Sequence, residues 1–430
     1  MSEPSRPVHD PLAALRQTDF RKFSLARFAS ASAQTMFQAA LAWQVYAISG
    51  EALQLGILGL VRFAPQLAAT FVAGAVADSY DRKRIVLISQ AIHAACSLVL
   101  AIASAGGWAT LPIIYALVVL LALANAFENP ARQALLPSIV HRETFQNAIT
   151  VTTTLQSLAF IVGPSIAGVV IAVSGVAGAY AANIVLLALS VVALAFLHPR
   201  PLEGERRTVS LEAIREGIRF VWRRQVLLGA MALDMFAVIF GGAQALLPIY
   251  ATDILHVGST GYGILASSMN AGALLASVVL VMIPQVQRTG RVLLISIVGF
   301  AGATIVFGLA RSFPLAVLAY TLVGMSDQVS VVMRQTTIQL ATPDRLRGRV
   351  TAINALFIGS SNQLGAVRAG FMAAATTPTI SVVGGGFMCL GVVALIALAL
   401  PGLRRYRIDA APDPEAEEDI ETARTPVALR

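Results

Sequence analysis

The feature that most constrains this chain is a series of long apolar runs separated by short polar connections. A helix that crosses a membrane needs about 20 predominantly apolar residues, and twelve segments reach that length. An apolar fraction of 57% with only 13% charged residues is typical of an integral membrane protein and excludes an ordinary soluble one. The predicted spans are residues 22–48, 53–77, 85–105, 109–128, 145–173, 177–197, 226–252, 259–283, 292–310, 313–334, 348–374 and 380–400.

The positive charges indicate how these spans are oriented. Of the connections that alternate with the basic ones, only the one at Arg311 carries a Lys or Arg. Connections on the cytoplasmic side carry an excess of such residues, so both termini are predicted to be cytoplasmic and the number of spans even. The net charge of +8 then reflects topology and not nucleic-acid binding. The basic connections precede the first span and include residues 82–84, 132–142, 200–224, 288–291, 345–349 and 404–407.

The longest connection, 198–225, divides the chain into two halves. Ser210 can cap a helix within it whose apolar residues share one face and whose later turns are rich in Arg. This pattern indicates a helix at the cytoplasmic lipid surface, either a structural linker or a lipid sensor. The predicted units are an N-terminal six-helix bundle (1–197), the linker (198–225), a C-terminal six-helix bundle (226–403) and a disordered acidic tail (404–430).

The two halves repeat one another. A shift of 202 residues places Arg132-Gln133 over Arg334-Gln335, and Gly163 and Gly168 over Gly365 and Gly370. Duplicated halves of this kind place a substrate site between them, near the middle of the bilayer. The predicted fold class is therefore an all-α membrane protein with twelve spans in two pseudo-symmetric halves.

The loop from Gly74 to Arg84, G-A-V-A-D-S-Y-D-R-K-R, resembles the signature loop of the major facilitator superfamily. Ser79 and Asp81 depart from that pattern, where the superfamily usually has Arg and Gly. The resemblance implies the major facilitator fold and transport by alternating access. A narrower resemblance, to the branch of enterobactin exporters and of drug and macrolide efflux proteins, rests on residues 129–137, Asn147-Ala148, Gly163-Pro164, Leu247-Pro248, Gly261-Tyr262-Gly263 and Arg347-Gly348-Arg349.

Gly163, Pro164 and Gly168 are similar to the antiporter motif of this superfamily, although Ala167 replaces the first glycine of its final pair. Pro164 removes a backbone hydrogen bond, and the glycines permit close approach of a neighbouring helix. The motif therefore indicates either an antiporter or simple close packing.

Charged residues near the cytoplasmic ends of the spans are predicted to form a gate. Asp78 is expected to face a helix N-terminus or to pair with Arg132, and Arg82 and Arg84 are expected to meet Glu128 or another acid. Contacts that hold one conformation and break in the other set the balance between them. The predicted gate residues are Gly74, Asp78, Asp81, Arg82, Arg84, Glu128, Arg132, Arg334, Arg347 and Arg349.

Three ionisable residues inside spans are candidates for proton coupling, because such groups are costly in a membrane and usually functional. Asp234 and Asp327 lie in the seventh and tenth spans and are expected to face the cavity. The alternative for each is a structural ion pair, for example Asp327 with Arg334. His93, in the third span, either titrates or is a hydrogen-bonded structural residue.

Uncharged polar and aromatic side chains in the spans are predicted to line a largely apolar cavity for an amphipathic solute. Arg62 and Arg368 either bind an anionic substrate or pair with an acid. The candidate cavity residues are Gln34, Gln38, Arg62, Gln66, Phe240, Gln244, Asn270, Asn354 and Arg368.

The sequence thus predicts a proton-coupled exporter of an amphipathic drug-like compound or siderophore in the inner membrane of a bacterium. A symporter, a uniporter or a non-transporting sensor on the same fold remains an alternative. The expected partners are a small-molecule substrate, protons and membrane lipids, and the chain is expected to act as a monomer. No cofactor, metal site or enzymatic activity is expected, and Cys96 and Cys389, each within an apolar run, predict no disulfide.

Overall fold

The computed structural model describes residues 13–198, 211–284 and 286–407, and these contain helices but no strand. The predicted cap Ser210 and almost all of the predicted tail lie outside the described residues. The surroundings of Gly74 and of the Asp78 side chain are also outside the description. The helices are α1 (Thr18–Ser49), α2 (Ala52–Ser79), α3 (Arg82–Ala105), α4 (Leu111–Ile139), α5 (Phe145–Ala195), α6 (Leu211–Arg223), α7 (Gln225–Gly241), α8 (Leu247–Ile249), α9 (Gly258–Met282), α10 (Thr289–Leu309), α11 (Phe313–Leu340), α12 (Asp344–Ala375), α13 (Pro378–Ala399) and α14 (Pro401–Arg405).

In the described ranges, nine helical segments are long and apolar enough to cross a membrane. One of them, α5, has 51 residues and includes two predicted spans, 145–173 and 177–197, that meet at Gly175. Gly175 has φ 70°, a left-handed conformation that glycine adopts without steric cost and that reverses the chain here. Helices α1 and α12 have 32 residues each but are more polar. The number of twelve spans stays a prediction.

The predicted span 226–252 is not one continuous helix. Helix α7 ends at Gly241, and the extended backbone of Gly242 leads into a short 3₁₀ turn, Gln244–Leu246. Helix α8 and a π-helical turn, Tyr250–Ile254, then complete the crossing. A Cβ atom on Gly242 would lie 2.8 Å from the Val238 carbonyl oxygen, so glycine fits the break, and the turn that follows places Gln244 in the wall of the central cavity.

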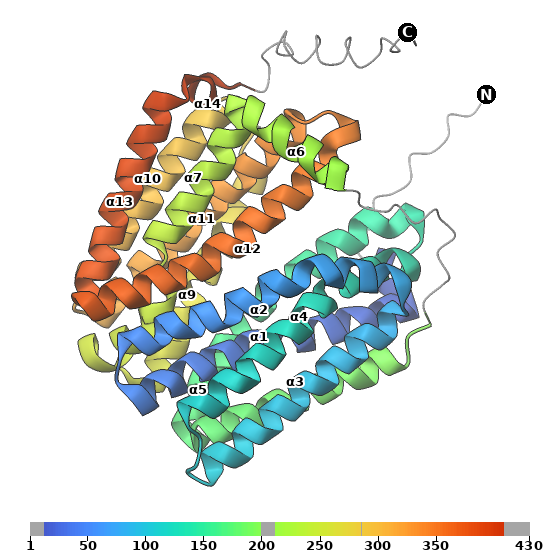
Figure 1. The fold of residues 1–430 in the computed structure, drawn as a ribbon, viewed down its shortest axis with the longest axis vertical. Coiled ribbons are helices and arrows are strands. Elements are labelled where there is room, and N and C mark those ends of the chain that lie inside the picture. Colours follow the sequence, from blue (N-terminus) through green and yellow to red (C-terminus); the bar gives the residue numbers. More distant parts are fainter. Residues whose placement is uncertain (1–12, 199–210, 285, 408–430) are drawn as a thin grey trace.

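The helices form two bundles (Figure 1). Helices α1 to α5 pack on one another, as do α7 and α9 to α13, and the bundles meet through α2 with α12 and α5 with α9. We call the end of the molecule with α6 and α14 the linker end. The opposite end, where α1 ends and α2 begins, is the far end.

The bundles touch closely through glycines. A Cβ atom on Gly168 of α5 would lie 2.8 Å from Cα of Gly263 on α9, and a Cβ atom on Gly56 of α2 would lie 3.2 Å from Cα of Gly370 on α12. Small residues let helix backbones approach closely. The hydrogen bonds that join the bundles in the described part of the chain all involve residues 39–46 or 160–165 of the first and 253–270 of the second. The described hydrogen bonds between the bundles therefore lie in the far half of the molecule.

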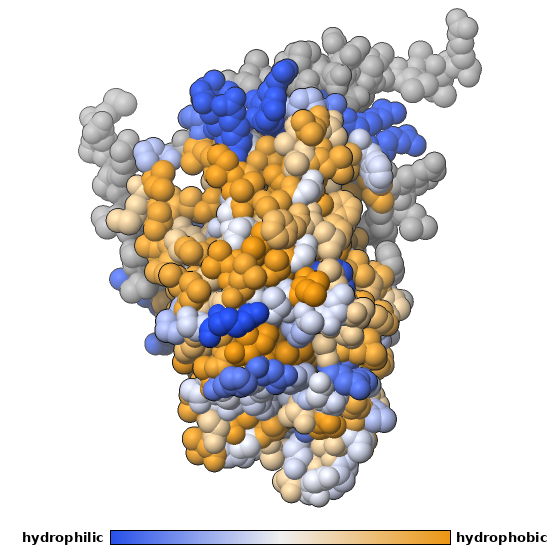
Figure 2. Space-filling view, turned by 90° about the vertical axis from the view of Figure 1, so that its left-hand side faces the viewer, coloured by the Kyte–Doolittle hydropathy of each residue, from blue (hydrophilic) through white to orange (hydrophobic). Residues whose placement is uncertain are grey.

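The outer surface is apolar over much of the face that Figure 2 shows, with hydrophilic side chains gathered near its upper end and in a second group below its middle. Large apolar side chains such as Val173, Val281 and Leu398 are 84%, 87% and 78% exposed. Such a surface is stable against lipid and not against water. The chain is accordingly a multi-pass membrane protein.

Gly168→Val is expected to open the far end. Its Cβ would lie 2.5 Å from the carbonyl oxygen of Ser259, and overpacking of this kind costs about 1–3 kcal/mol. Spin labels are placed on the parts of α5 and α9 that lie at the far end of the molecule. Double electron–electron resonance should give a longer distance between them than in the wild type. Gly302→Val is the matched control, because nothing lies within 4 Å of a Cβ there. An unchanged distance in Gly168→Val would contradict the role of this contact.

Candidate functional site

A cavity of about 500 Å³ lies between the two bundles and is lined by residues of both. Among the predicted cavity residues, Gln34, Gln38 and Arg62 line it from the first bundle, and Gln244 and Asn270 from the second. The wall also contains polar residues that the prediction omitted: Thr35, Tyr262, Tyr320, Asn362 and Gln363. Asn362 and Gln363 are adjacent polar residues inside a predicted span, a signal that could have identified them.

Four other predicted cavity residues lie elsewhere. Gln66 lines a smaller neighbouring cavity, and Phe240 stacks on Phe236 with ring centroids 6.2 Å apart. The Oδ1 atom of Asn354 accepts a hydrogen bond of 2.9 Å from Arg334. Arg368 donates to the backbone carbonyls of residues 239, 242 and 381, so its predicted acidic partner is replaced by peptide oxygens.

The two membrane-embedded aspartates differ. Asp234 of α7 is 4% exposed, does not line the cavity, and forms an ion pair of 3.2 Å with Arg334 of α11. Of the structural ion pairs considered as alternatives, Asp327 with Arg334 is not formed, because the Arg334 guanidinium faces Asp234 on the neighbouring helix. Asp327 lines the cavity, and the described residues offer it no hydrogen bond or ion pair.

The first bundle contains a matching buried charge cluster. Arg132 of α4 pairs with Glu128 and donates a 2.9 Å hydrogen bond to Ser30 of α1, and Gln90 also donates to Glu128, at 3.3 Å. The expected contact of Glu128 with Arg82 or Arg84 is wrong, since Arg132 on the same helix occupies it. Arg132 and Arg334 are related by the shift of 202 residues, so each bundle has an arginine–carboxylate pair at its repeated position.

Two polar groups beside the cavity are buried without partners. The Nη2 atom of Arg62 and the Nε2 atom of His93 have no hydrogen-bond partner among the described residues. The edge of the His93 ring packs against Phe37, with centroids 4.9 Å apart. The prediction that Arg62 pairs with an acid is therefore wrong, because no described carboxylate reaches it.

At the linker end, the described contacts of three predicted gate cations lie within their own bundle or with α6. Arg82 donates to the Ala134 carbonyl at 3.3 Å, and Arg84 lies 3.6 Å from Asp81, whose carboxylate caps α3. In the second bundle, Arg349 pairs with Glu216 of α6. Arg347 also lies at this end, at the start of α12. The described contacts of the cations in this paragraph therefore join neither bundle to the other.

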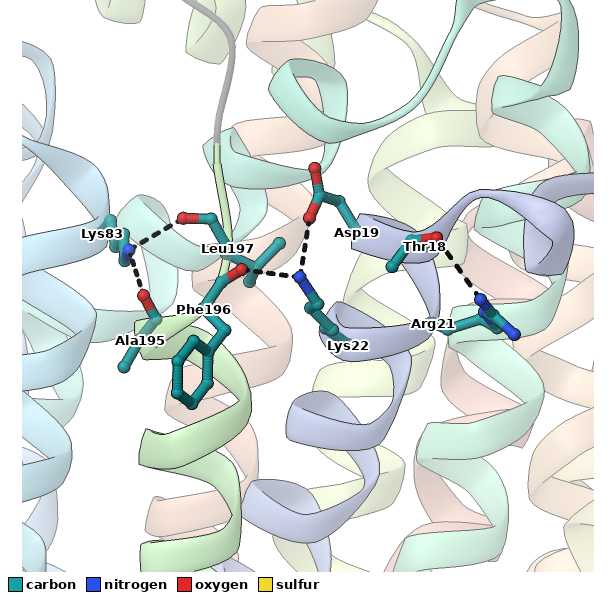
Figure 3. Close-up of polar contacts among 8 residues, drawn as sticks. All are labelled: Thr18, Asp19, Arg21, Lys22, Lys83, Ala195, Phe196 and Leu197. Atoms are coloured by element: carbon teal, nitrogen blue, oxygen red, sulfur yellow. Dashed lines mark hydrogen bonds and ion pairs between the residues drawn. The ribbon is translucent and has the colours of Figure 1, made fainter.

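Figure 3 shows two lysines that hold the C-terminal end of α5. Lys83 donates to the carbonyls of Ala195 and Leu197 at 2.8 Å, and Lys22 donates to the Phe196 carbonyl at 2.9 Å. Lysines stabilise the free carbonyls and the negative dipole at a helix C-terminus. They fix the point from which the connection to the second bundle departs.

Gly163, Pro164 and Gly168 lie where α5 contacts two helices. A Cβ on Gly163 would meet the backbone of Ser32 and Met36 on α1, and Gly168 faces α9 of the other bundle. The motif therefore occupies a helix crossing that belongs to both a bundle core and the bundle interface.

The contacts that close the far end were not predicted. The hydroxyl of Tyr46 in α1 donates to the carboxylate of Asp253 in the π-helical turn, and that of Tyr262 donates to the Ala39 carbonyl at 3.1 Å. Ser165 and Ser267 are hydrogen-bonded at 2.7 Å between α5 and α9. We call these contacts the far-end latch. No local sequence pattern marks them, because each joins residues at least 102 positions apart.

An all-helical membrane protein with two bundles around a shared central cavity has the architecture of a secondary transporter of the major facilitator superfamily. Within that class, the chain belongs to the family described as transmembrane secretion effectors, which it matches over residues 9–430. It is a transporter and not an enzyme.

Curated relatives include the enterobactin exporter EntS of Citrobacter koseri, which is 26% identical over 391 residues, or 90% of this chain and 93% of that protein. The enterobactin exporter EntS of Escherichia coli O1:K1 / APEC shows the same identity and coverage.

Solved structures with this fold include a peptide transporter POT in complex with sulfate, with a TM-score of 0.71 and 12% identity, covering 93% of this chain and 99% of that one. A bacterial homolog of the human lysosomal transporter Spinster, in an inward-facing and unoccupied conformation, has a TM-score of 0.68 and 13% identity, covering 97% of this chain and 100% of that one. These likenesses show the fold.

Asp234→Ala is expected to lower the free energy of unfolding by about 3–5 kcal/mol, because it leaves Arg334 buried without its charged partner. The double variant Asp234→Ala/Arg334→Met should lose less than the sum of the two single changes. Asp19→Ala removes a partly exposed pair with Lys22 and should cost less than about 1 kcal/mol. Equilibrium unfolding in detergent measures all four, and strict additivity would contradict the coupling.

Tyr46→Phe is expected to weaken the far-end latch by removing a hydrogen bond to a charged group, which changes a conformational equilibrium by roughly 10- to 100-fold. Labelling from the far end of a cysteine placed at Ala266, which lines the cavity, should become correspondingly faster. Tyr115→Phe is the control, because its hydroxyl bonds Gln54 within the first bundle. Equal labelling rates in both variants would contradict the latch.

Proposed function

We propose that the protein exports an amphipathic siderophore or related aromatic compound by proton antiport. The unpaired Asp327 carboxylate in the cavity between the bundles carries this proposal. The curated relatives named as enterobactin exporters support the direction and the class of substrate. The cavity supports an amphipathic substrate, because glutamine and asparagine amides alternate in its wall with apolar residues such as Phe160, Met269 and Phe300.

In this proposal the linker end is cytoplasmic, as are both termini. The charges that favour this orientation lie at that end and include Arg82, Lys83 and Arg84. The two six-helix units end at residues 197 and 403, with the linker 198–225 between them. The protein acts as a monomer whose apolar surface contacts membrane lipids.

Alternating access follows from which contacts must break. With the linker end cytoplasmic, the described far-end latch closes the cavity toward the outside. Export requires these hydrogen bonds to open and the predicted gate residues Gly74, Asp78, Asp81, Arg82 and Arg84 to close the linker end. The glycine contacts allow the change, because backbones without side chains between them can slide with few steric barriers.

Asp327 is the principal proton carrier in this proposal. A charged carboxylate is unfavourable in a membrane interior unless it is paired or solvated. Asp327 can therefore take a proton when the cavity opens to the outside and release it when cytoplasmic water enters. Asp234 is held by Arg334 and is the second candidate, and His93, which lines the smaller cavity, is the third.

Asp327→Asn is expected to reduce substrate-driven proton flux at least tenfold in proteoliposomes that contain a trapped pH-sensitive dye. The amide keeps the size of the side chain but cannot exchange the proton. A panel of enterobactin, a macrolide and a lipophilic cation supplies the substrate gradient. Wild-type flux opposite in direction to the substrate indicates antiport.

Asp234→Asn and His93→Gln are measured beside Asp327→Asn, and Asp19→Asn serves as the control for loss of an acid outside the cavity. If Asp327→Asn keeps full proton flux and Asp234→Asn or His93→Gln loses it, the residue whose variant loses the flux is the proton carrier. Substrate movement without proton flux in the wild type would refute antiport and indicate a uniporter.

A further inference from the structure

A second, smaller cavity of about 170 Å³ adjoins the main one inside the first bundle. Helices α1 to α4 form it, and Gln363 of α12 completes its wall. Gln34, Gln38, Arg62 and Gln363 line both cavities, so the two spaces share a wall. We call the smaller one the polar side pocket, and its polar lining includes Gln34, Gln38, Arg62, His93, Asn125 and Asn129.

Two of the buried side-chain atoms that lack a hydrogen-bond partner line this one pocket. They are Nη2 of Arg62 and Nε2 of His93, which come from different helices, α2 and α3. Most buried polar groups in proteins have a hydrogen-bond partner, and an exception calls for a physical explanation. Two such groups lining the same small cavity indicate a site at which a polar group of a ligand can supply the missing hydrogen bonds.

The surroundings of Arg62 do not neutralise its charge. Tyr180 and Tyr262 are its neighbouring titratable groups, but their hydroxyls donate to Gln44 at 2.6 Å and to the Ala39 carbonyl at 3.1 Å. Glu128, the buried acid of the first bundle, is paired with Arg132. The pocket therefore has a positive charge that no described carboxylate pairs with, unlike the buried arginines of α4 and α11.

Asn125 and Asn129 extend the set of hydrogen-bonding groups around this charge. They are spaced i, i+4 on α4 and therefore share a face. The shift of 202 residues that aligns Arg132 with Arg334 also aligns Asn125 with Asp327. At this repeated position the first bundle, which contains Arg62, has the neutral amide of Asn125, and the second bundle has the carboxylate of Asp327. The two halves of the site therefore have opposite electrostatic character.

We propose that the polar side pocket binds an anionic oxygen group of the transported molecule, a carboxylate or phenolate, through the Arg62 guanidinium and the amides of α1 and α4. The body of the molecule then occupies the main cavity. This inference rests on the proposed transport function and specifies the chemistry of the substrate. A guanidinium is suited to it, because its fixed donors match the oxygens of a carboxylate.

The test is binding of salicylate and of its neutral amide, salicylamide, to the purified full-length protein by ligand-observed NMR. The wild type should prefer salicylate. Arg62→Gln should weaken salicylate binding about 10- to 100-fold, the usual range for loss of a hydrogen bond to a charged group. Salicylamide binding should change little. Arg62→Lys keeps the charge and should retain much of the preference.

Arg311→Gln is the matched control for loss of one positive charge, because Arg311 bonds the carbonyls of Gly308 and Ala310 away from both cavities. It should bind salicylate as the wild type does. Monodisperse elution and unchanged salicylamide binding verify that each variant is folded. An equal preference for salicylate in Arg62→Gln and wild type, or no preference in the wild type, would overturn the inference.

Transport of enterobactin separates this inference from the proposed function. If the wild type prefers salicylate through Arg62 but moves no enterobactin, the siderophore proposal fails and the anion pocket remains. If enterobactin is moved equally well by wild type and Arg62→Gln, the function remains and the pocket is not its recognition site.

Discussion

The structure depends on the free-energy cost of placing a charged group in the interior of a membrane. A buried ion that loses its partner is strongly destabilising, whereas a paired one is tolerated. Each bundle follows this rule with one arginine–carboxylate pair, Glu128 with Arg132 on α4 and Asp234 with Arg334 between α7 and α11. Against this background, Arg62 and Asp327 are exceptions, because each lines the central cavity without a charged partner in the described residues.

These exceptions connect the packing of the helices to transport. Each buried charge pair lies within one bundle, and the glycine contacts between α2 and α12 and between α5 and α9 let the bundles meet without interlocking side chains. A molecule built in this way can change the angle between its bundles while each core stays intact. The unpaired groups line the central cavity, which opens to one side and then to the other. A proton or a substrate that enters the cavity can supply the interaction that they lack.

Among the described residues, the hydrogen bonds that cross between the bundles lie at the far end. The far end is held by contacts that cross between bundles, including Tyr46 with Asp253, whereas Arg82, Lys83 and Arg349 at the linker end contact only their own side or α6. The described contacts between the bundles therefore hold the far end together.

The sequence by itself determined the membrane class, the helical fold and the family, because spanning helices need long apolar runs and the repeat at Arg132 and Arg334 is visible at a constant shift. It also indicated that Gln34, Gln38, Gln244 and Asn270 belong to a cavity, since polar side chains inside spans avoid lipid. Only the tertiary structure decided which charges are paired. Asp234 rather than Asp327 meets Arg334, and Arg62 meets no acid, because these contacts depend on which helices are neighbours and on how each is rotated. The Tyr46–Asp253 contact joins residues 207 positions apart, a separation at which periodicity and local motifs hold no information.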